Sequence, residues 1–142
     1  DITFDVIIGG SNSNYKNIKT YLEKFDNLNF YYNIDNIPEV LSKADLCIGS
    51  IGQSFYERLL LKIPSIVFTI ADNQLEINDK YKNNNIFIYC GHKIPNCEII
   101  INKLTNIIDN VDQWKKMVSN CINLSNKFIS KNYIKDIINK IS

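Results

Sequence analysis

The chain has 142 residues, 45% of them hydrophobic and 22% charged, so it can bury one substantial core and we expect a single domain over residues 1–142. Its formal net charge is +1 and its lysines are scattered among acids, which argues against a nucleic-acid partner. No apolar run approaches the roughly 20 residues of a membrane helix, and the first residues do not resemble a signal peptide, so we expect a cytoplasmic protein without a membrane span.

Short apolar runs alternate with helical patterns from the start of the chain. The pattern predicts strands over residues 4–8, 29–34, 45–49, 65–70 and 86–90, and helices over residues 14–24, 37–43, 55–62 and 75–81. Residues 97–142 are helical in pattern, with apolar stripes that include Ile101, Leu104, Met117 and Ile122. Strict alternation predicts an α/β fold, a Rossmann-like parallel sheet flanked by helices, with the C-terminal helices packed back on the sheet.

The cysteines predict no metal or redox centre. Cys47, Cys90, Cys97 and Cys121 lack the C-x-x-C spacing of zinc and redox sites, and two of them fall in predicted strands. We interpret them as reduced, structural thiols. The sequence also offers no ligand set for a metal and no motif for a cofactor.

A glycine turn follows the first predicted strand, where residues 9–14 read Gly-Gly-Ser-Asn-Ser-Asn. Small residues there let backbone N–H groups approach a diphosphate, because ligands of parallel sheets bind beyond the carboxyl ends of the strands. The turn matches neither G-x-G-x-x-G nor the P-loop motif. The alternative is an ordinary turn in which Ser13 or Asn14 caps the next helix.

A second candidate segment, residues 49–58, lies between the third strand and its helix. It places Glu57 in the predicted first turn of that helix, where a carboxylate can accept both hydroxyls of a ribose. The alternative is a capping box, in which Ser54 caps the helix and Glu57 reaches back to the Ser54 N–H.

The third candidate segment, residues 71–74, follows the fourth strand and offers amide side chains that suit sugar hydroxyls or an N-acetyl group. Its alternative is again capping, by Asp72 or Asn73. His92, the only histidine, falls in a predicted loop after the fifth strand. We interpret it as a surface or structural residue, because the sequence pairs it with no Ser, Cys or carboxylate.

Three runs in this order resemble a known family: residues 34–41, 44–49 and 52–58, continued by residues 61–67 and 71–74. The family is the UDP-sugar hydrolase of pseudaminic acid biosynthesis. It is similar to the C-terminal domain of the peptidoglycan enzyme that transfers N-acetylglucosamine from UDP, and both have the GT-B fold. The resemblance covers roughly residues 3–91, and its most specific part runs from Ala44 to Gln74.

The resemblance implies a role for ten residues of this chain. Glu57 would bind the ribose hydroxyls, the backbone at Ile34 would read the uracil edge, and Asn73 and Gln74 would face the sugar. The residues expected near the diphosphate are Gly10, Ser11, Asn12, Gly52, Gln53 and Ser54. The sequence differs from the family pattern at Gln53, Phe55 and Tyr56.

The resemblance also implies that the catalytic base, a histidine, stands on an N-terminal domain that this sequence lacks. The chain opens in a strand without an initiating Met, so we expect Asp1 to be a cut boundary. The expected function is therefore nucleotide-sugar binding within a hydrolase that acts on a UDP-linked amino or deoxy sugar, in surface-polysaccharide or nonulosonic acid biosynthesis. Alternatives are the donor-binding domain of a GT-B glycosyltransferase, a donor-site subunit for a partner chain, and a non-catalytic flavodoxin-like or receiver-like domain.

Overall fold

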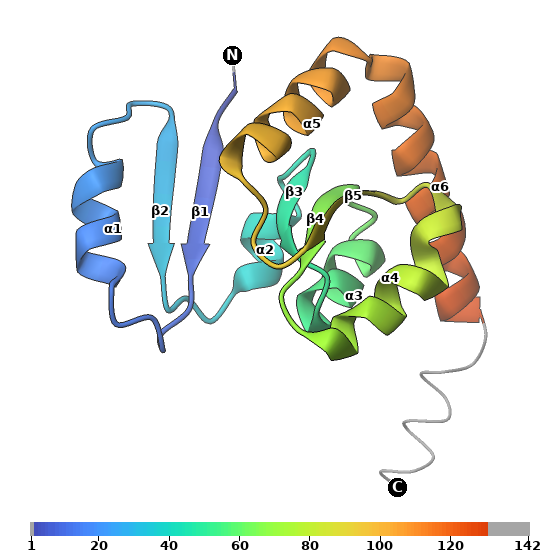
Figure 1. Cartoon of the computed structure of the whole chain (residues 1–142), viewed down its shortest axis with the longest axis horizontal. Coiled ribbons are helices and arrows are strands. Elements are labelled where there is room, and N and C mark those ends of the chain that lie inside the picture. Colours follow the sequence, from blue (N-terminus) through green and yellow to red (C-terminus); the bar gives the residue numbers. More distant parts are fainter. Residues whose placement is uncertain (1, 131–142) are drawn as a thin grey trace, which may run out of the picture. The chain divides into compact units, whose positions relative to one another are not determined.

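The computed structural model describes residues 2–130, and the chain divides into two compact units, residues 1–43 and residues 44–142 (Figure 1). Every strand pairing within each unit is parallel, and helices connect the strands. The predicted α/β, Rossmann-like class is therefore confirmed. The helix predicted for residues 131–142 lies outside the described residues.

The first unit is built around a two-stranded parallel sheet. Its elements are β1 (Phe4–Ile8), α1 (Tyr15–Leu22), β2 (Leu28–Tyr32) and α2 (Ile37–Leu41). The ring of Tyr15, at the start of α1, stacks on Tyr32 with the ring centroids 3.8 Å apart. None of residues 2–43 is buried, because two short strands and two short helices provide too few neighbours to enclose a side chain.

The second unit is a three-stranded parallel sheet in the order β3-β4-β5, with helices on it. Its elements are β3 (Cys47–Ser50), α3 (Gln53–Leu60), β4 (Ser65–Thr69), the 3₁₀ turn η1 (Asp72–Gln74), α4 (Leu75–Tyr81), the 3₁₀ turn η2 (Lys82–Asn84), β5 (Phe87–His92), α5 (Cys97–Asp109) and α6 (Val111–Ser130). A strand that is covered on both faces is buried along most of its length, as β4 is: Phe68 alone of its five residues is only partly buried. The central strand thus fixes the position of the turns that follow β3, β4 and β5.

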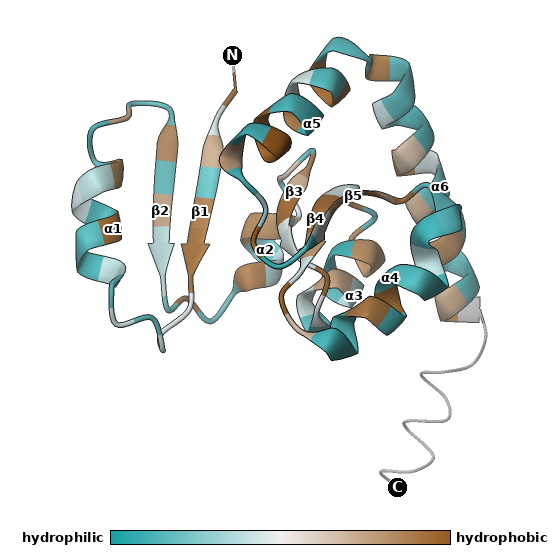
Figure 2. Ribbon diagram, viewed as in Figure 1, coloured by the Kyte–Doolittle hydropathy of each residue, from teal (hydrophilic) through white to brown (hydrophobic). Residues whose placement is uncertain are grey.

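The core of the second unit lies between its sheet and the helices that follow the strands. Its buried cluster consists of Ile51, Phe55, Leu59, Val67, Tyr81, Ile86, Phe87 and Cys121. Figure 2 shows the brown, apolar stretches of β3 and β4 at the centre of this unit, under helices with teal outer faces. Aromatic rings meet edge to face here, with the centroids of Phe55 and Phe87 5.6 Å apart, which adds to the stabilisation from burial.

Side chains of helix α6 donate hydrogen bonds to backbone carbonyls in the loops and helix ends of the second unit. Trp114 Nε1 donates to the carbonyl of Asp45 at 3.0 Å, and Asn120 Nδ2 donates to the carbonyl of Asn85 at 3.2 Å. The Ser125 hydroxyl donates to the Leu60 carbonyl at 3.4 Å. Within the described residues, this confirms the predicted packing of the C-terminal helices.

Several element boundaries differ from the prediction, and those of α3 and β5 matter for the site. Helix α3 begins at Gln53, two residues earlier than predicted, since Gly52 already occupies the N-cap position. It ends at Leu60, and Lys62 then takes a left-handed conformation with φ 66°. Strand β5 runs on to His92, so this residue closes a strand and does not lie in a loop, as the sequence had predicted.

Candidate functional site

The turn between β3 and α3 presents backbone groups that no side chain caps. Gly52 occupies the N-cap position in an extended conformation, and it makes no side-chain cap bond. The buried Ile51 anchors the turn, because its N–H donates to the carbonyl of Phe68 on β4 at 2.9 Å. The N–H groups of Gln53 and Ser54, the first two residues of α3, are therefore available to a hydrogen-bond acceptor on a ligand.

Glu57 takes no part in capping α3. The helix begins at Gln53, which places Glu57 in its second turn. The prediction that Glu57 lies in the first turn is therefore wrong. The capping-box alternative is wrong, because it requires Ser54 at the N-cap position that Gly52 occupies. The side chain of Glu57 is exposed, so its carboxylate is accessible to a ligand.

A buried arginine holds the end of β3 in place. Arg58 is 4% exposed, and its Nη2 donates to the carbonyl of Ser50. A Cβ atom at Gly49 would lie 2.9 Å from Arg58 Nη1, so the guanidinium packs where only glycine leaves room. Burial lowers the pKa of Arg58, and the nearby Cys47 and Glu57 partly offset this effect. No role was predicted for Arg58, although its place three residues after buried Phe55 puts it on the inward face of the helix.

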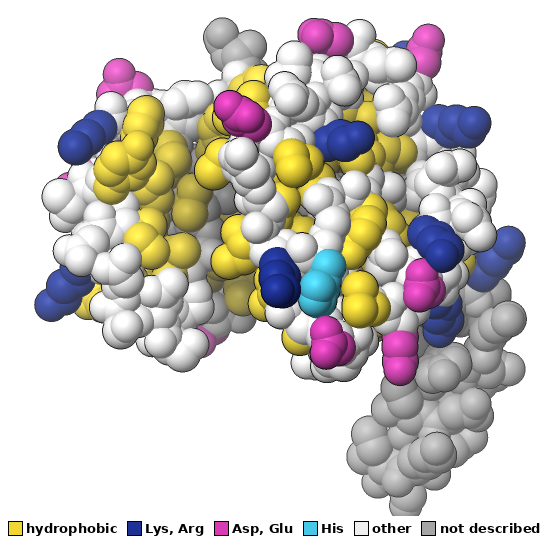
Figure 3. Space-filling view, in the orientation of Figure 1, with side chains coloured by type: hydrophobic (Ala, Val, Ile, Leu, Met, Phe, Trp, Pro, Cys, Tyr) yellow, Lys and Arg dark blue, Asp and Glu magenta, His cyan; other side chains and the backbone are white. Residues whose placement is uncertain are grey.

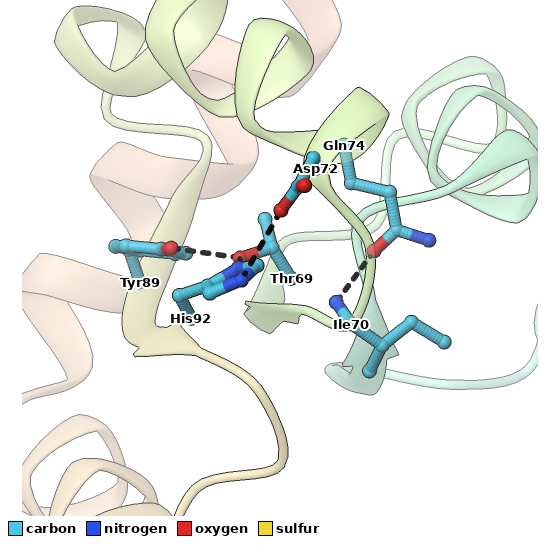
Figure 4. Close-up of polar contacts among 6 residues, drawn as sticks. All are labelled: Thr69, Ile70, Asp72, Gln74, Tyr89 and His92. Carbon is cyan, nitrogen blue, oxygen red and sulfur yellow. Dashed lines mark hydrogen bonds and ion pairs between the residues drawn. The ribbon is translucent and has the colours of Figure 1, made fainter.

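The second and third predicted segments meet at this edge of the sheet. Gln74 Oε1 accepts the N–H of Ile70 at 2.8 Å (Figure 4). This bond fixes the amide, whose Nε2 lies 3.2 Å from the position of a Cβ on Gly52. Asn73 stands beside Gln74 in η1 and is exposed. The capping alternative for this segment is wrong, because neither Asp72 nor Asn73 is an N-cap: Ala71 precedes η1 and Gln74 precedes α4, both without a side-chain cap bond.

In the first unit, the predicted glycine turn is closed by its own hydrogen bonds. The Asn12 N–H donates to the Gly9 carbonyl at 3.1 Å, and Asn12 Oδ1 accepts the N–H of Asn14 at 2.9 Å. Tyr32 donates its hydroxyl to the Gly10 carbonyl at 3.0 Å, while Ser11 is exposed. Asn14 is the N-cap residue of α1, as the alternative interpretation proposed, but its side chain makes no cap bond.

Gly10 and Ile34 are both placed by Asn33, the residue that follows β2. Asn33 takes a left-handed conformation with φ 49°, so β2 ends at Tyr32 and Ile34 lies beyond the strand, not within it as predicted. A Cβ on Gly10 would clash with Oδ1 of Asn33. Glycine at position 10 thus lets the two strand ends approach each other. These residues belong to the first unit, and residues 52–74 belong to the second.

Several other findings bear on the kind of site. Among residues 2–130, no group of three or more His, Cys, Asp or Glu side chains is arranged to hold a metal ion, and none of the helices there is long and apolar enough to cross a membrane. Acidic and basic side chains are interspersed on the face drawn in Figure 3. A shallow hollow elsewhere in the second unit includes none of the predicted site residues; it is lined by Asn85, Phe87, Ile88, Gln113, Lys116 and Met117.

By its fold, the protein belongs to the Rossmann-like α/β class, and its polar turns lie at the carboxyl edge of the three-stranded sheet. No protein-family model matches the chain. An uncharacterized protein of the archaeon Methanocaldococcus jannaschii is 32% identical over 84 residues, which cover 57% of this chain. The chain spans 17% of that protein's length.

Proposed function

We propose that this chain binds the UDP portion of a UDP-linked amino or deoxy sugar, as the nucleotide-binding part of a UDP-sugar hydrolase. The observation that carries the proposal is the arrangement at the carboxyl edge of β3 and β4. There the uncapped start of α3 and the fixed amide of Gln74 meet at Gly52. Ligands of parallel sheets bind at this edge.

Each part of this arrangement suits one part of the ligand. The open N–H groups at the start of α3 suit a diphosphate oxygen, and the amide of Gln74 lies beside them, against Gly52. The accessible carboxylate of Glu57 suits the two ribose hydroxyls, since an ionised carboxylate only accepts hydrogen bonds. The resemblance to the pseudaminic-acid hydrolases adds uridine as the nucleoside. The proposal assigns no catalytic base to this chain.

Calorimetric titration with UDP, UMP and ADP tests the proposal. We expect UDP to bind most tightly and Glu57→Gln to weaken UDP binding about tenfold, because a hydrogen bond to a charged group contributes about 1.5–3 kcal/mol. The matched control is Glu23→Gln, which changes an exposed glutamate at the end of α1 and leaves UDP affinity unchanged. Equal affinity for ADP and UDP, or equal effects of the two substitutions, would overturn the proposal.

A further inference from the structure

A chain of three polar side chains lies at the carboxyl ends of β4 and β5. Thr69 is fully buried, and its hydroxyl is 2.9 Å from the hydroxyl of Tyr89 and 2.9 Å from Nδ1 of His92 (Figure 4). The other nitrogen of His92, Nε2, lies 3.5 Å from the carboxylate of Asp72 in η1. Nδ1 of the imidazole is thus fixed by the buried Thr69, and Nε2 lies on the side of the exposed Asp72.

An irregular strand register creates this contact. Val67 pairs with Tyr89, but Thr69 pairs with His92, so β5 contains one residue more than β4 over this stretch. Gly91, within the bulge, has φ 116°, which favours glycine. Side chains alternate along a regular strand, so residues three apart would point to opposite faces. The bulge cancels this alternation and brings Tyr89 and His92 to the same hydroxyl, as bulges beside functional sites often do.

The hydrogen-bond partners define the tautomer of a neutral His92. The Thr69 hydroxyl has one proton, and it can donate this proton to Nδ1 while accepting the proton of the Tyr89 hydroxyl. Nε2 then keeps its hydrogen and directs it toward the Asp72 carboxylate. The opposite tautomer would direct the Nε2 lone pair at that carboxylate, which is unfavourable. The hydrogen-bonded relay of Tyr89, Thr69 and His92 therefore holds an N–H donor at the surface.

The outward groups suit a ligand with hydroxyl or amino groups. The side chain of Asp72 is 96% exposed and that of His92 is 35% exposed, so both can contact a ligand. A carboxylate repels phosphate, but it accepts hydrogen bonds from hydroxyl and amino groups, and the Nε2–H donates to a sugar oxygen. Asp72 belongs to the same turn as Gln74, whose amide lies against Gly52. The polar groups thus continue from the proposed diphosphate contact.

We propose that His92 and Asp72 form a sugar-recognition subsite, in which Nε2–H and the carboxylate bind hydroxyl or amino substituents of the sugar. This inference rests on the proposed nucleotide-sugar function. Thr69 and Tyr89 are positioning residues, because they hold the imidazole and are not directed at the ligand. The subsite explains a cluster that nucleotide binding alone leaves without a role.

The test compares UDP with UDP-N-acetylglucosamine by calorimetry on the 142-residue chain and on His92→Asn. The amide of asparagine reaches the position of Nδ1, so it retains a partner for Thr69, but it has no group at the position of Nε2. We expect unchanged UDP affinity and an affinity for UDP-N-acetylglucosamine about tenfold lower. The matched control is Lys93→Asn, at the adjacent exposed residue with φ 68°, which leaves both affinities unchanged.

The outcomes separate this subsite from the nucleotide proposal. Failure of the wild-type chain to bind UDP would overturn both. The sugar subsite alone would be overturned if the wild-type chain binds UDP but His92→Asn loses affinity for both ligands equally, or for neither.

A second variant tests the positioning role of Thr69. Thr69→Val removes the hydroxyl at nearly constant volume. We expect it to weaken only UDP-N-acetylglucosamine binding and to change the imidazole ¹⁵N spectrum from the Nε2–H tautomer to a mixture. An unchanged ¹⁵N spectrum would contradict the relay.

Discussion

The two units differ in how they bury their side chains. None of residues 2–43 is buried, whereas Ile66, Val67 and Thr69 of β4 are all fully enclosed. The polar cluster around Thr69 and the turn at Gly52 both belong to the second unit, which also contains this core. The difference indicates that recognition by aligned side chains depends on a packed sheet, since rigid elements hold a site more accurately than loops do.

The largest expected effect is on the free energy of unfolding of core variants. We expect Ile66→Ala, at the centre of β4, to lower it by about 2–5 kcal/mol, because the substitution removes a fully buried side chain and leaves a cavity. The matched variant in the first unit is Ile7→Ala, at a half-buried strand position, with an expected loss of about 1 kcal/mol. Urea denaturation followed by circular dichroism measures both losses. Equal losses would contradict the contrast between the units.

A second, smaller difference is expected in hydrogen exchange. We expect the free energy of opening to be at least about 1.4 kcal/mol lower for the strand amides of β1 and β2 than for those of β4. Fewer buried contacts oppose the opening of β1 and β2. Native-state exchange measured by NMR at increasing urea concentrations gives the opening free energy of each amide. Coincident values for β1 and β4 would mean that the two units unfold as one.

The smallest effect concerns the thiols, which all lie in the second unit. Burial raises the pKa of Cys121 to about 12 and also raises that of Cys47, so both stay protonated at pH 8 and react slowly. We expect the exposed Cys97 to react first with a thiol reagent, and the two buried thiols only in urea. Because the Cys121 thiol ionises near pH 9 when unfolded, its contribution to stability is lost as pH rises from about 9 to 12. Fast labelling of Cys121 in the native protein would contradict this packing.

Much of the fold could be predicted because periodicity reports burial directly. The β-branched run from Ser65 predicts a covered central strand, and Leu75 to Tyr81 is helical within the predicted bounds. The apolar stripe of α6 was less accurate. Ile122 is 36% exposed, while Cys121 is 1% exposed and directs its thiol at the Ile86 carbonyl at 3.7 Å. Hydropathy favours the larger residue at such a position, but the close approach to Ile86, just before β5, selects the smaller one.

The candidate site was predictable where it follows strand ends and unpredictable where it depends on register. Gly52 and Gln74 follow the ends of neighbouring strands, so their proximity is a consequence of parallel topology. His92 has no Ser, Cys or carboxylate partner in sequence, and only the bulge at Gly91 brings it to Thr69. A pairing shift of one residue leaves no periodic signal, so a role for His92 in a site could not be predicted.

The bonds of α6 have a consequence for synthesis of the chain on the ribosome. Trp114 meets Asp45 across 69 residues of sequence and Ser125 meets Leu60 across 65, whereas Asn29 meets Asp5 across only 24. The strands of the first unit can therefore pair soon after they emerge, but the second unit has to await α6 before its core closes. Until then the buried cluster that Cys121 of α6 completes is open to other nascent chains, and we expect chaperones to engage the protein in that interval.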